Sequence, residues 1–339
     1  MKVGLVLGGG GLVGMGYHAG ALKALDDWGI NPNAADLIIG TSAGSILGSY
    51  LRIGWTPGDF FDYAHGQHPR SESTADGQRD EVRRIFTPMW SDRSERARRA
   101  VGSLFAAASS RGLWRRIGGR VPSERLRKAF PSGLYSTKET LRRLEDDLPQ
   151  EWPQQLLYLC ASDLYSGKRV PFGKKGAPEA RLPEAVLAST AIPGVFPPVR
   201  IGSRYYVDGG VLTATSLDLA TDEGCKAIIC IAPLGFRRDA DAQLREDIRL
   251  LGPMAVRSLF ARALKREVVA ARESGVDVLV IRPWVTELKA HGTNSMRHFD
   301  RPALVKSARE GTIRLLEENS DHPSVEAFLE KSAKKEQVG

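Results

Sequence analysis

The chain has 339 residues, of which 42% are hydrophobic and 26% charged, and its formal net charge is +8. This composition excludes a disordered or fibrous protein, and the length allows one large domain or two modest ones. No apolar run approaches the roughly 20 residues that span a bilayer. The first apolar run, of about five residues, is shorter than the core of a signal peptide. Cys160 and Cys230 lie in apolar runs, so we expect small core residues and a reducing, cytoplasmic compartment, with membrane association left open.

Apolar runs alternate with helical patterns along the chain, which is typical of an α/β protein. The predicted strands are 2–7, 36–40, 156–161, 205–207, 227–232 and 276–281. The predicted helices are 14–28, 43–53, 91–108, 137–145, 182–188, 241–273 and 301–318. Continuous apolar runs such as 227–231 indicate central strands that are buried on both faces.

Four consecutive glycines, Gly8 to Gly11, follow the first predicted strand and open a helix; residues 8–14 are called the glycine loop below. Gly9, Gly11 and Gly14 fit the Gly-x-Gly-x-x-Gly pattern, which by itself favours dinucleotide binding. That use needs an acidic residue at the end of the second strand, where Ser42 stands instead, since Asp36 begins that strand. The alternative is an oxyanion hole, in which glycine amides face the charge that forms on a carbonyl oxygen. The residues therefore favour the oxyanion hole.

Gly40-Thr41-Ser42-Ala43-Gly44 stands between the second predicted strand and a helix. Strand, Gly-x-Ser-x-Gly and helix together are the pattern of a nucleophile elbow, which exposes the serine hydroxyl on a sharp turn. Gly40 and Gly44 would lack a side chain because the backbone packs closely there. The helix N-terminus would favour negative charge next to Ser42. We therefore expect Ser42 to be a nucleophile, with a plain structural turn as the alternative.

A serine nucleophile needs a base, and the usual hydrolase order of serine, aspartate and histidine would use His291 or His298. That fold places several strands before its nucleophile, whereas one strand precedes Ser42, so a triad is disfavoured. His18 lies in the first predicted helix, and we expect it to be a packed or exposed helical residue. No pair of histidines has zinc-ligand spacing with cysteine or glutamate partners, so no metal is expected.

Asp208 is the other candidate base. It ends a short apolar strand and is followed by Gly209 and Gly210, which allow a sharp turn and leave the carboxylate uncovered. A plain turn aspartate is the alternative, because Asp-Gly is a common hairpin signal.

The segment 92–128 carries eleven Arg or Lys residues against three Asp or Glu, interleaved with Leu113, Trp114 and Ile117. It belongs to a polar, mostly helical stretch, about 69–149, that looks inserted into the α/β core as a cap. Basic and large apolar residues together suit peripheral contact with an anionic membrane. A solvated helical face is an equally supported interpretation. No recognised reading motif accompanies the charge, so nucleic acid is not expected.

The glycine loop, the Gly-x-Ser-x-Gly motif and the later Asp-Gly-Gly together resemble the patatin-like phospholipase family. Two further segments match it, namely 161–167 (ASDLYSG) and 188–198 (ASTAIPGVFPP). The resemblance covers residues 1–235 outside the insertion and is weaker as far as residue 318. It implies a three-layer α/β/α fold with a mostly parallel sheet. We expect one acyl hydrolase domain at 1–320, which includes the insertion, and a C-terminal helix and tail at 321–339.

The resemblance also implies hydrolysis of a lipid or fatty-acyl ester without metal or cofactor. Ser42 would then be the nucleophile and Asp208 the general base; the oxyanion amides would come from Gly9, Gly10 and Gly11, with Gly14 allowing close packing. One departure is Val13, which stands where the family usually has Arg or Lys, so the loop itself lacks that charge. The other functional classes that the sequence leaves open are a non-catalytic lipid carrier and a nucleotide-binding oxidoreductase.

Overall fold

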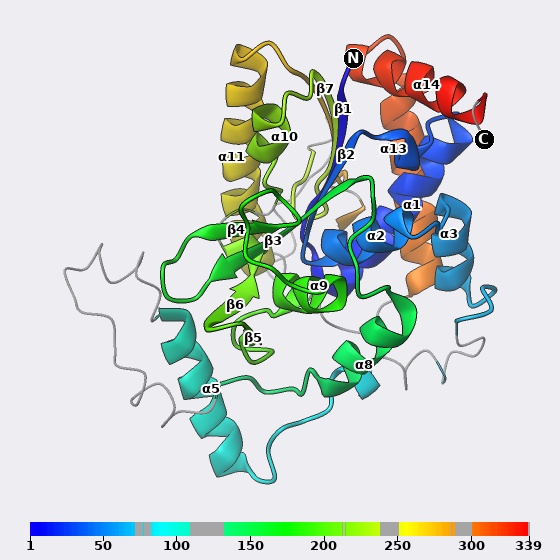
Figure 1. The fold of residues 1–339 in the computed structure, drawn as a ribbon. Coiled ribbons are helices and arrows are strands. Elements are labelled where there is room, and N and C mark those ends of the chain that lie inside the picture. The colour runs from blue at the N-terminus through cyan, green and yellow to red at the C-terminus, as the bar shows by residue number, and fades with distance from the viewer. Residues whose placement is uncertain are drawn as a thin grey trace. The chain divides into compact units, whose positions relative to one another are not determined.

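The computed structural model describes residues 1–71, 77, 83–108, 132–211, 213, 215–237, 251–285, 287–288 and 300–337 (Figure 1). Its internal contacts divide the chain into two compact units. Unit 1 comprises Met1–Thr74, Pro153–Tyr158 and Thr213–Gly339, and unit 2 comprises Ala75–Trp152 and Leu159–Leu212. His291, His298 and residues 109–128 of the basic segment lie outside the described residues.

The described part of unit 1 is built on parallel strands in the order β2, β1, β7 and β8. Every residue of β1, β2 and β7 is buried, as the continuous apolar runs predict. Leu7 of β1 pairs with Gly40 of β2, so the loops that follow these two strands leave the same edge of the sheet. The strand bounds are β1 (Val3–Leu7), β2 (Leu37–Thr41), β7 (Ala227–Ile231) and β8 (Asp277–Ile281).

Helices cover both faces of these strands. Figure 1 shows α10 and α11 on one side of β1 and β7, and α1, α13 and α14 on the other. The described helices of unit 1 are α1 (Gly11–Asp27), α2 (Ala43–Arg52), α3 (Pro57–His65), α10 (Asp218–Asp222), α11 (Leu251–Glu273), α13 (Arg301–Glu317) and α14 (Pro323–Glu336). Unit 1 therefore has the predicted arrangement of helix, sheet and helix layers.

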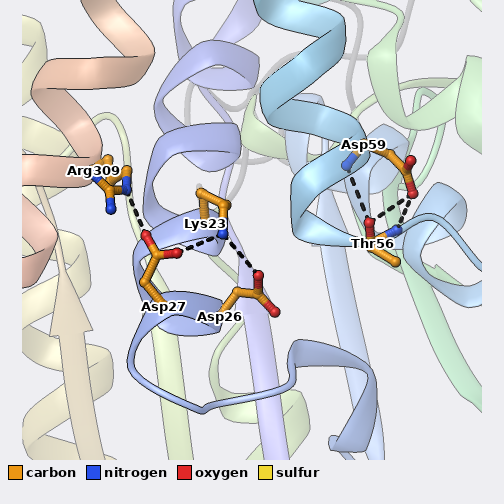
Figure 2. Close-up of polar contacts among 6 residues, drawn as sticks. All are labelled: Lys23, Asp26, Asp27, Thr56, Asp59 and Arg309. Carbon is orange, nitrogen blue, oxygen red and sulfur yellow. Dashed lines mark hydrogen bonds and ion pairs between the residues drawn. The ribbon is translucent and has the colours of Figure 1, made fainter. Parts of the chain in front are cut away.

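The helices α1 and α13 pack at close range. A Cβ on Gly20 of α1 would lie 2.2 Å from the main-chain oxygen of Val305 in α13, so only glycine allows this approach. Arg309 of α13 donates to the Asp27 carboxylate, 2.5 Å away, and Lys23 reaches the same carboxylate within α1 (Figure 2). The close approach of the two helices thus depends on Gly20, and part-exposed ion pairs lie at the edge of the contact.

The helix α3 was not predicted, although its sequence carries a start signal. Thr56 accepts a hydrogen bond from the amide of Asp59, and the Asp59 carboxylate accepts one from the amide of Thr56 (Figure 2). This reciprocal capping box, followed by Pro57 in the first turn, fixes where the helix begins.

Unit 2 contains antiparallel pairs. The strand β6 (Arg204–Asp208) pairs with both β3 and β5 (Val199–Ile201), and β4 (Arg169–Phe172) pairs with β3. The strand β3 (Leu156–Asp163) has its first three residues in unit 1. The described helices of this unit are α5 (Arg93–Ala108), α8 (Lys138–Asp147) and α9 (Leu182–Thr190). The helices α5 and α8 occupy the stretch predicted to be a helical insertion.

The predicted α/β class, with a mixed and mostly parallel sheet flanked by helices, is confirmed. Cys160 and Cys230 are core residues as predicted, and Cys225 is also buried; none of the three forms a disulfide. Within the described ranges, no helix combines the length and the apolar character needed to cross a membrane.

Candidate active site

Ser42 stands at a strained turn between β2 and α2. Its backbone angles are φ 53° and ψ −119°, and Ser216 is the only other described non-glycine residue with a positive φ. Such a conformation costs a side-chain-bearing residue on the order of 1–3 kcal/mol. The Ser42 hydroxyl makes no capping bond to α2, although serine at this position usually caps a helix. The turn therefore keeps the Ser42 hydroxyl out of the helix-capping hydrogen bond that serine usually makes at this position.

The glycines on either side of Ser42 are sterically required. A Cβ on Gly44 would lie 2.0 Å from the main-chain oxygen of Leu7, and one on Gly40 would lie 2.6 Å from the oxygen of Gly44. Ser45 donates its hydroxyl to the Ser42 carbonyl at 2.6 Å and so closes the turn. These contacts place the first turn of α2 directly against β1.

The glycine loop lies beside this turn. A Cβ on Gly14 would be 3.5 Å from the Cβ of Ala43, which adjoins Ser42. A Cβ on Gly10 would be 2.7 Å from the Cα of Gly14, so the loop is tightly folded at the start of α1. Within the described part of the chain, no hydrogen bond occupies the buried amides of Gly9 and Gly10. Buried amides without partners are uncommon in proteins. These two N–H groups can therefore donate hydrogen bonds to an anionic oxygen.

The dinucleotide alternative conflicts with the position of Asp36. This residue precedes β2, at the edge of the sheet opposite the glycine loop. Its carboxylate accepts the amide of Val3 at 2.7 Å and pairs with Lys331 at 2.7 Å. The acidic group that would hold a ribose is therefore engaged at the wrong edge of the sheet.

Asp208 ends β6 in unit 2 and is 5% exposed. Its amide donates to the carbonyl of Ala191, 3.0 Å away, and its Oδ1 accepts the amide of Gly210 at 2.7 Å. A Cβ on Gly209 would lie 2.3 Å from the carbonyl oxygen of Cys160 in β3. The two glycines therefore have different uses: Gly209 allows close packing, and Gly210 orients the carboxylate.

The end of α9 and the segment that follows it are tied to neighbouring backbone. Ser189 donates its hydroxyl to the Cys160 carbonyl at 2.7 Å, which ties the end of α9 to β3. The amides of Leu134 and Tyr135 donate to the Val195 carbonyl at 2.9 and 3.0 Å. The 188–198 segment is thus held in place at both Ser189 and Val195, and its Ala191 carbonyl accepts the Asp208 amide between them.

The described histidines have structural partners. His18 is fully buried, and its Nε2 lies 2.7 Å from the Gly8 carbonyl oxygen. The Nδ1 of His65 lies 2.7 Å from the Phe61 carbonyl oxygen, and His322 accepts the Ser324 amide at the start of α14. Of the two expectations for His18, packed or exposed, the packed one is correct.

Two residues beside the glycine loop were missed by the sequence analysis. Pro233 follows β7, and a Cβ on Gly10 would lie 3.0 Å from its Cβ. Arg257 of α11 donates to the Pro233 carbonyl at 2.7 Å. Burial lowers the pKa of Arg257 to about 10, so it stays charged at neutral pH. The Arg257 guanidinium thus supplies a positive charge near the loop, although the loop itself is uncharged at Val13. No sequence pattern marks the contact between Arg257 and Pro233, because the two residues are far apart in the chain.

Comparison with known proteins agrees with the motifs. The model of the family described as patatin-like phospholipase matches residues 5–221. The "Probable lipid hydrolase 463L" of Invertebrate iridescent virus 6 is 26% identical over 216 residues, which are 64% of this chain and 62% of that protein. The match therefore spans less than two thirds of this relative's length.

Two solved structures are also similar. VipD from Legionella pneumophila has 18% identity and a TM-score of 0.45, covering 94% of this chain and 67% of that chain. The type III effector protein ExoU has 14% identity and a TM-score of 0.34, covering 94% and 53%. The family model matches more than half of the chain. The resemblance seen in the motifs is thus confirmed, and the protein belongs to the patatin-like phospholipase family.

Proposed function

We propose that this protein is a lipid acyl hydrolase that cleaves carboxylic esters through a covalent acyl-Ser42 intermediate. The observation that carries the proposal is the positive φ of Ser42 on a turn buttressed by Gly40 and Gly44. Strained backbone of this kind persists mainly where function needs it. Family membership adds the expectation that the acyl group belongs to a lipid.

In the first step, Asp208 accepts the Ser42 proton as the serine Oγ forms a bond to the acyl carbon. Ser42 belongs to unit 1 and Asp208 to unit 2, so the pairing of these side chains is part of the proposal. The carbonyl electron pair moves to oxygen, and the amides of Gly9, Gly10 and Gly11 stabilise that oxyanion. The N-terminus of α2 favours the same charge.

The tetrahedral intermediate then breaks its bond to the leaving alcohol, which takes the proton from Asp208. Water attacks the acyl-Ser42 ester and gives a proton to the same carboxylate. The bond between the acyl carbon and Ser42 Oγ then breaks, Oγ takes that proton back, and the fatty acid is released. An aspartic acid has a reference pKa of about 3.9, so its carboxylate is a weak base. Alcohol and thiol leaving groups need less help from an acid than amines do. We therefore expect cleavage of esters and thioesters in preference to amides.

The substrate class is a phospholipid, a lysophospholipid or another fatty-acyl ester presented at a membrane. Peripheral contact through the 92–128 segment, in a cytoplasmic protein, is part of this proposal. Support comes from α5, where Val101 is 54% exposed and Arg96 stacks over Trp90 at 5.3 Å. A basic, partly apolar helix of this kind suits an anionic lipid surface.

The chemistry is tested by hydrolysis of a short p-nitrophenyl ester. Ser42→Ala and Asp208→Asn should each lower kcat by at least about 10³-fold. Asp222→Asn, which changes an exposed carboxylate on α10, serves as the control and should keep wild-type activity. Undiminished hydrolysis in either of the first two variants would reject the assignment of that residue.

The lipid class is tested by incubating the protein with a mixed lipid panel and following the products by mass spectrometry. Release of free fatty acid by wild type, but not by Ser42→Ala, supports the proposal. Tight lipid binding without turnover would favour a lipid carrier instead. For the membrane contact, binding to anionic vesicles should weaken as salt rises. Equal binding to neutral vesicles would refute its electrostatic part.

A further inference from the structure

His18 is fully buried in α1, and its ring contacts the glycine loop. Its Nε2 lies 2.7 Å from the carbonyl oxygen of Gly8, and the amide of Gly8 donates to Ile231 of β7 at 2.8 Å. Both polar groups of Gly8 therefore have fixed partners. The peptide that joins Gly8 to Gly9 is held at the point where β1 becomes the loop.

The contact also defines the form of the imidazole. A carbonyl oxygen only accepts hydrogen bonds, so the Nε2 of His18 carries the hydrogen. The Nδ1 is buried and has no hydrogen-bond partner within the described part of the chain. An unprotonated Nδ1 is compatible with this site, whereas an imidazolium would bury a second N–H without an acceptor. Burial lowers the pKa of His18 to about 4, which keeps the ring neutral at physiological pH.

The direction of the Gly8 carbonyl determines the direction of the next amide. No cis peptide occurs in the described residues, and in a planar trans peptide the C=O and N–H groups point in opposite directions. Because the Gly8 carbonyl points to His18, the Gly9 N–H points away from that ring. This is one of the buried loop amides without a described partner. The same loop packs beside the turn that carries Ser42, through Gly14 and Ala43.

We propose that His18 is a positioning residue, which orients the Gly8–Gly9 peptide so that the Gly9 amide donates to the oxyanion of the acyl carbonyl. This inference rests on the proposed function, because it assigns a role within that reaction. His18 exchanges no proton with the substrate. Its Nε2–H fixes a peptide that could otherwise rotate, since glycine on both sides permits many backbone angles. An oxyanion donor must be oriented before the reaction in order to stabilise the transition state.

The test compares three substitutions in a p-nitrophenyl ester assay. His18→Leu fills similar space without a donor, His18→Gln offers an amide N–H that can reach Gly8, and His18→Asn offers one that is too short. We expect His18→Leu and His18→Asn to lower kcat about 10- to 100-fold while KM stays within about twofold of wild type. We expect the kcat of His18→Gln to be at least about tenfold higher than that of His18→Leu. If His18→Leu does not fold, the comparison of Gln with Asn still decides.

His65→Leu is the matched control, because it removes a histidine contact of the same length, 2.7 Å to the Phe61 carbonyl, from α3 of the same unit. It should leave kcat unchanged. Three outcomes would overturn the positioning role. They are a wild-type kcat in His18→Leu, a change in KM alone, and an equal loss of kcat in His18→Gln and His18→Asn. An inactive wild-type protein would instead reject the proposed function itself, and the two failures are therefore distinguishable.

Discussion

The Cα of Gly44 lies against the main-chain oxygen of Leu7, so close that a Cβ on residue 44 would be 2.0 Å from that oxygen. Leu7 is the last residue of β1, and the glycine loop follows it directly. Gly44 is in the first turn of α2, two residues after Ser42. One backbone contact therefore sets the spacing between the turn of the candidate nucleophile and the loop of the candidate oxyanion hole.

Gly44→Ala should lower the free energy of unfolding by several kcal/mol, because the added methyl group meets backbone that cannot move without displacing β1. The measurement is urea or thermal unfolding. Gly58→Ala is the control, because a Cβ there would meet only Thr56 Oγ1, at an ordinary 3.5 Å. Alanine in α3 should be neutral or stabilise by up to about 1 kcal/mol. Similar stabilities for the two variants would contradict the contact.

The strain at Ser42 predicts a difference in stability between two inactive variants. Ser42→Gly and Ser42→Ala should both abolish ester hydrolysis, since both lack the hydroxyl. Glycine adopts a φ of 53° without steric cost, whereas alanine keeps the strain. Ser42→Gly should therefore be more stable than Ser42→Ala by about 1 kcal/mol, even after the greater freedom of glycine in the unfolded chain is counted. A less stable glycine variant would mean that the turn is not strained.

Much of this arrangement could be predicted from the sequence, because it depends on patterns local to the chain. The strands β1, β2 and β7 were placed within a residue at each end, since long apolar runs bounded by polar or glycine residues mark them. The start of α1 was predicted at Gly14, but the helix begins at Gly11. The short strands β4 and β5 were missed, because a run of three or four residues carries too little periodicity to recognise.

Contacts between distant residues could not be predicted in the same way. No local pattern links Gly209 to the Cys160 carbonyl, or Arg257 to the carbonyl behind the glycine loop. His18 could be assigned to a helix, but its partner Gly8 lies ten residues away across a loop whose path glycine leaves undetermined. The motifs thus predict the candidate site residues, whereas the contacts that support those residues arise only in the folded chain.

The buried His18 predicts a pH dependence of stability. Its pKa falls from about 6.5 in the unfolded chain to about 4 in the folded protein, because burial disfavours the imidazolium. Between these values the unfolded state binds more protons, so stability decreases as the pH falls from 6.5 to 4. The size of this contribution is about 3 kcal/mol.

The measurement is the free energy of unfolding of wild type and of His18→Gln at several pH values. The stability of wild type relative to the variant should drop across this window, because the variant lacks the titrating group and the other groups cancel. Parallel curves for the two proteins would show that His18 titrates alike in the folded and unfolded states.

The most direct test of the central claim is the rate of covalent labelling by a fluorophosphonate, with the modified residue identified by mass spectrometry. We predict a single adduct on Ser42 in wild type, none in Ser42→Ala, and labelling at least about 10²-fold slower in folded Asp208→Asn. Labelling of Asp208→Asn at the wild-type rate, or an adduct on another residue, would contradict the assignment of Ser42 as nucleophile and Asp208 as its base.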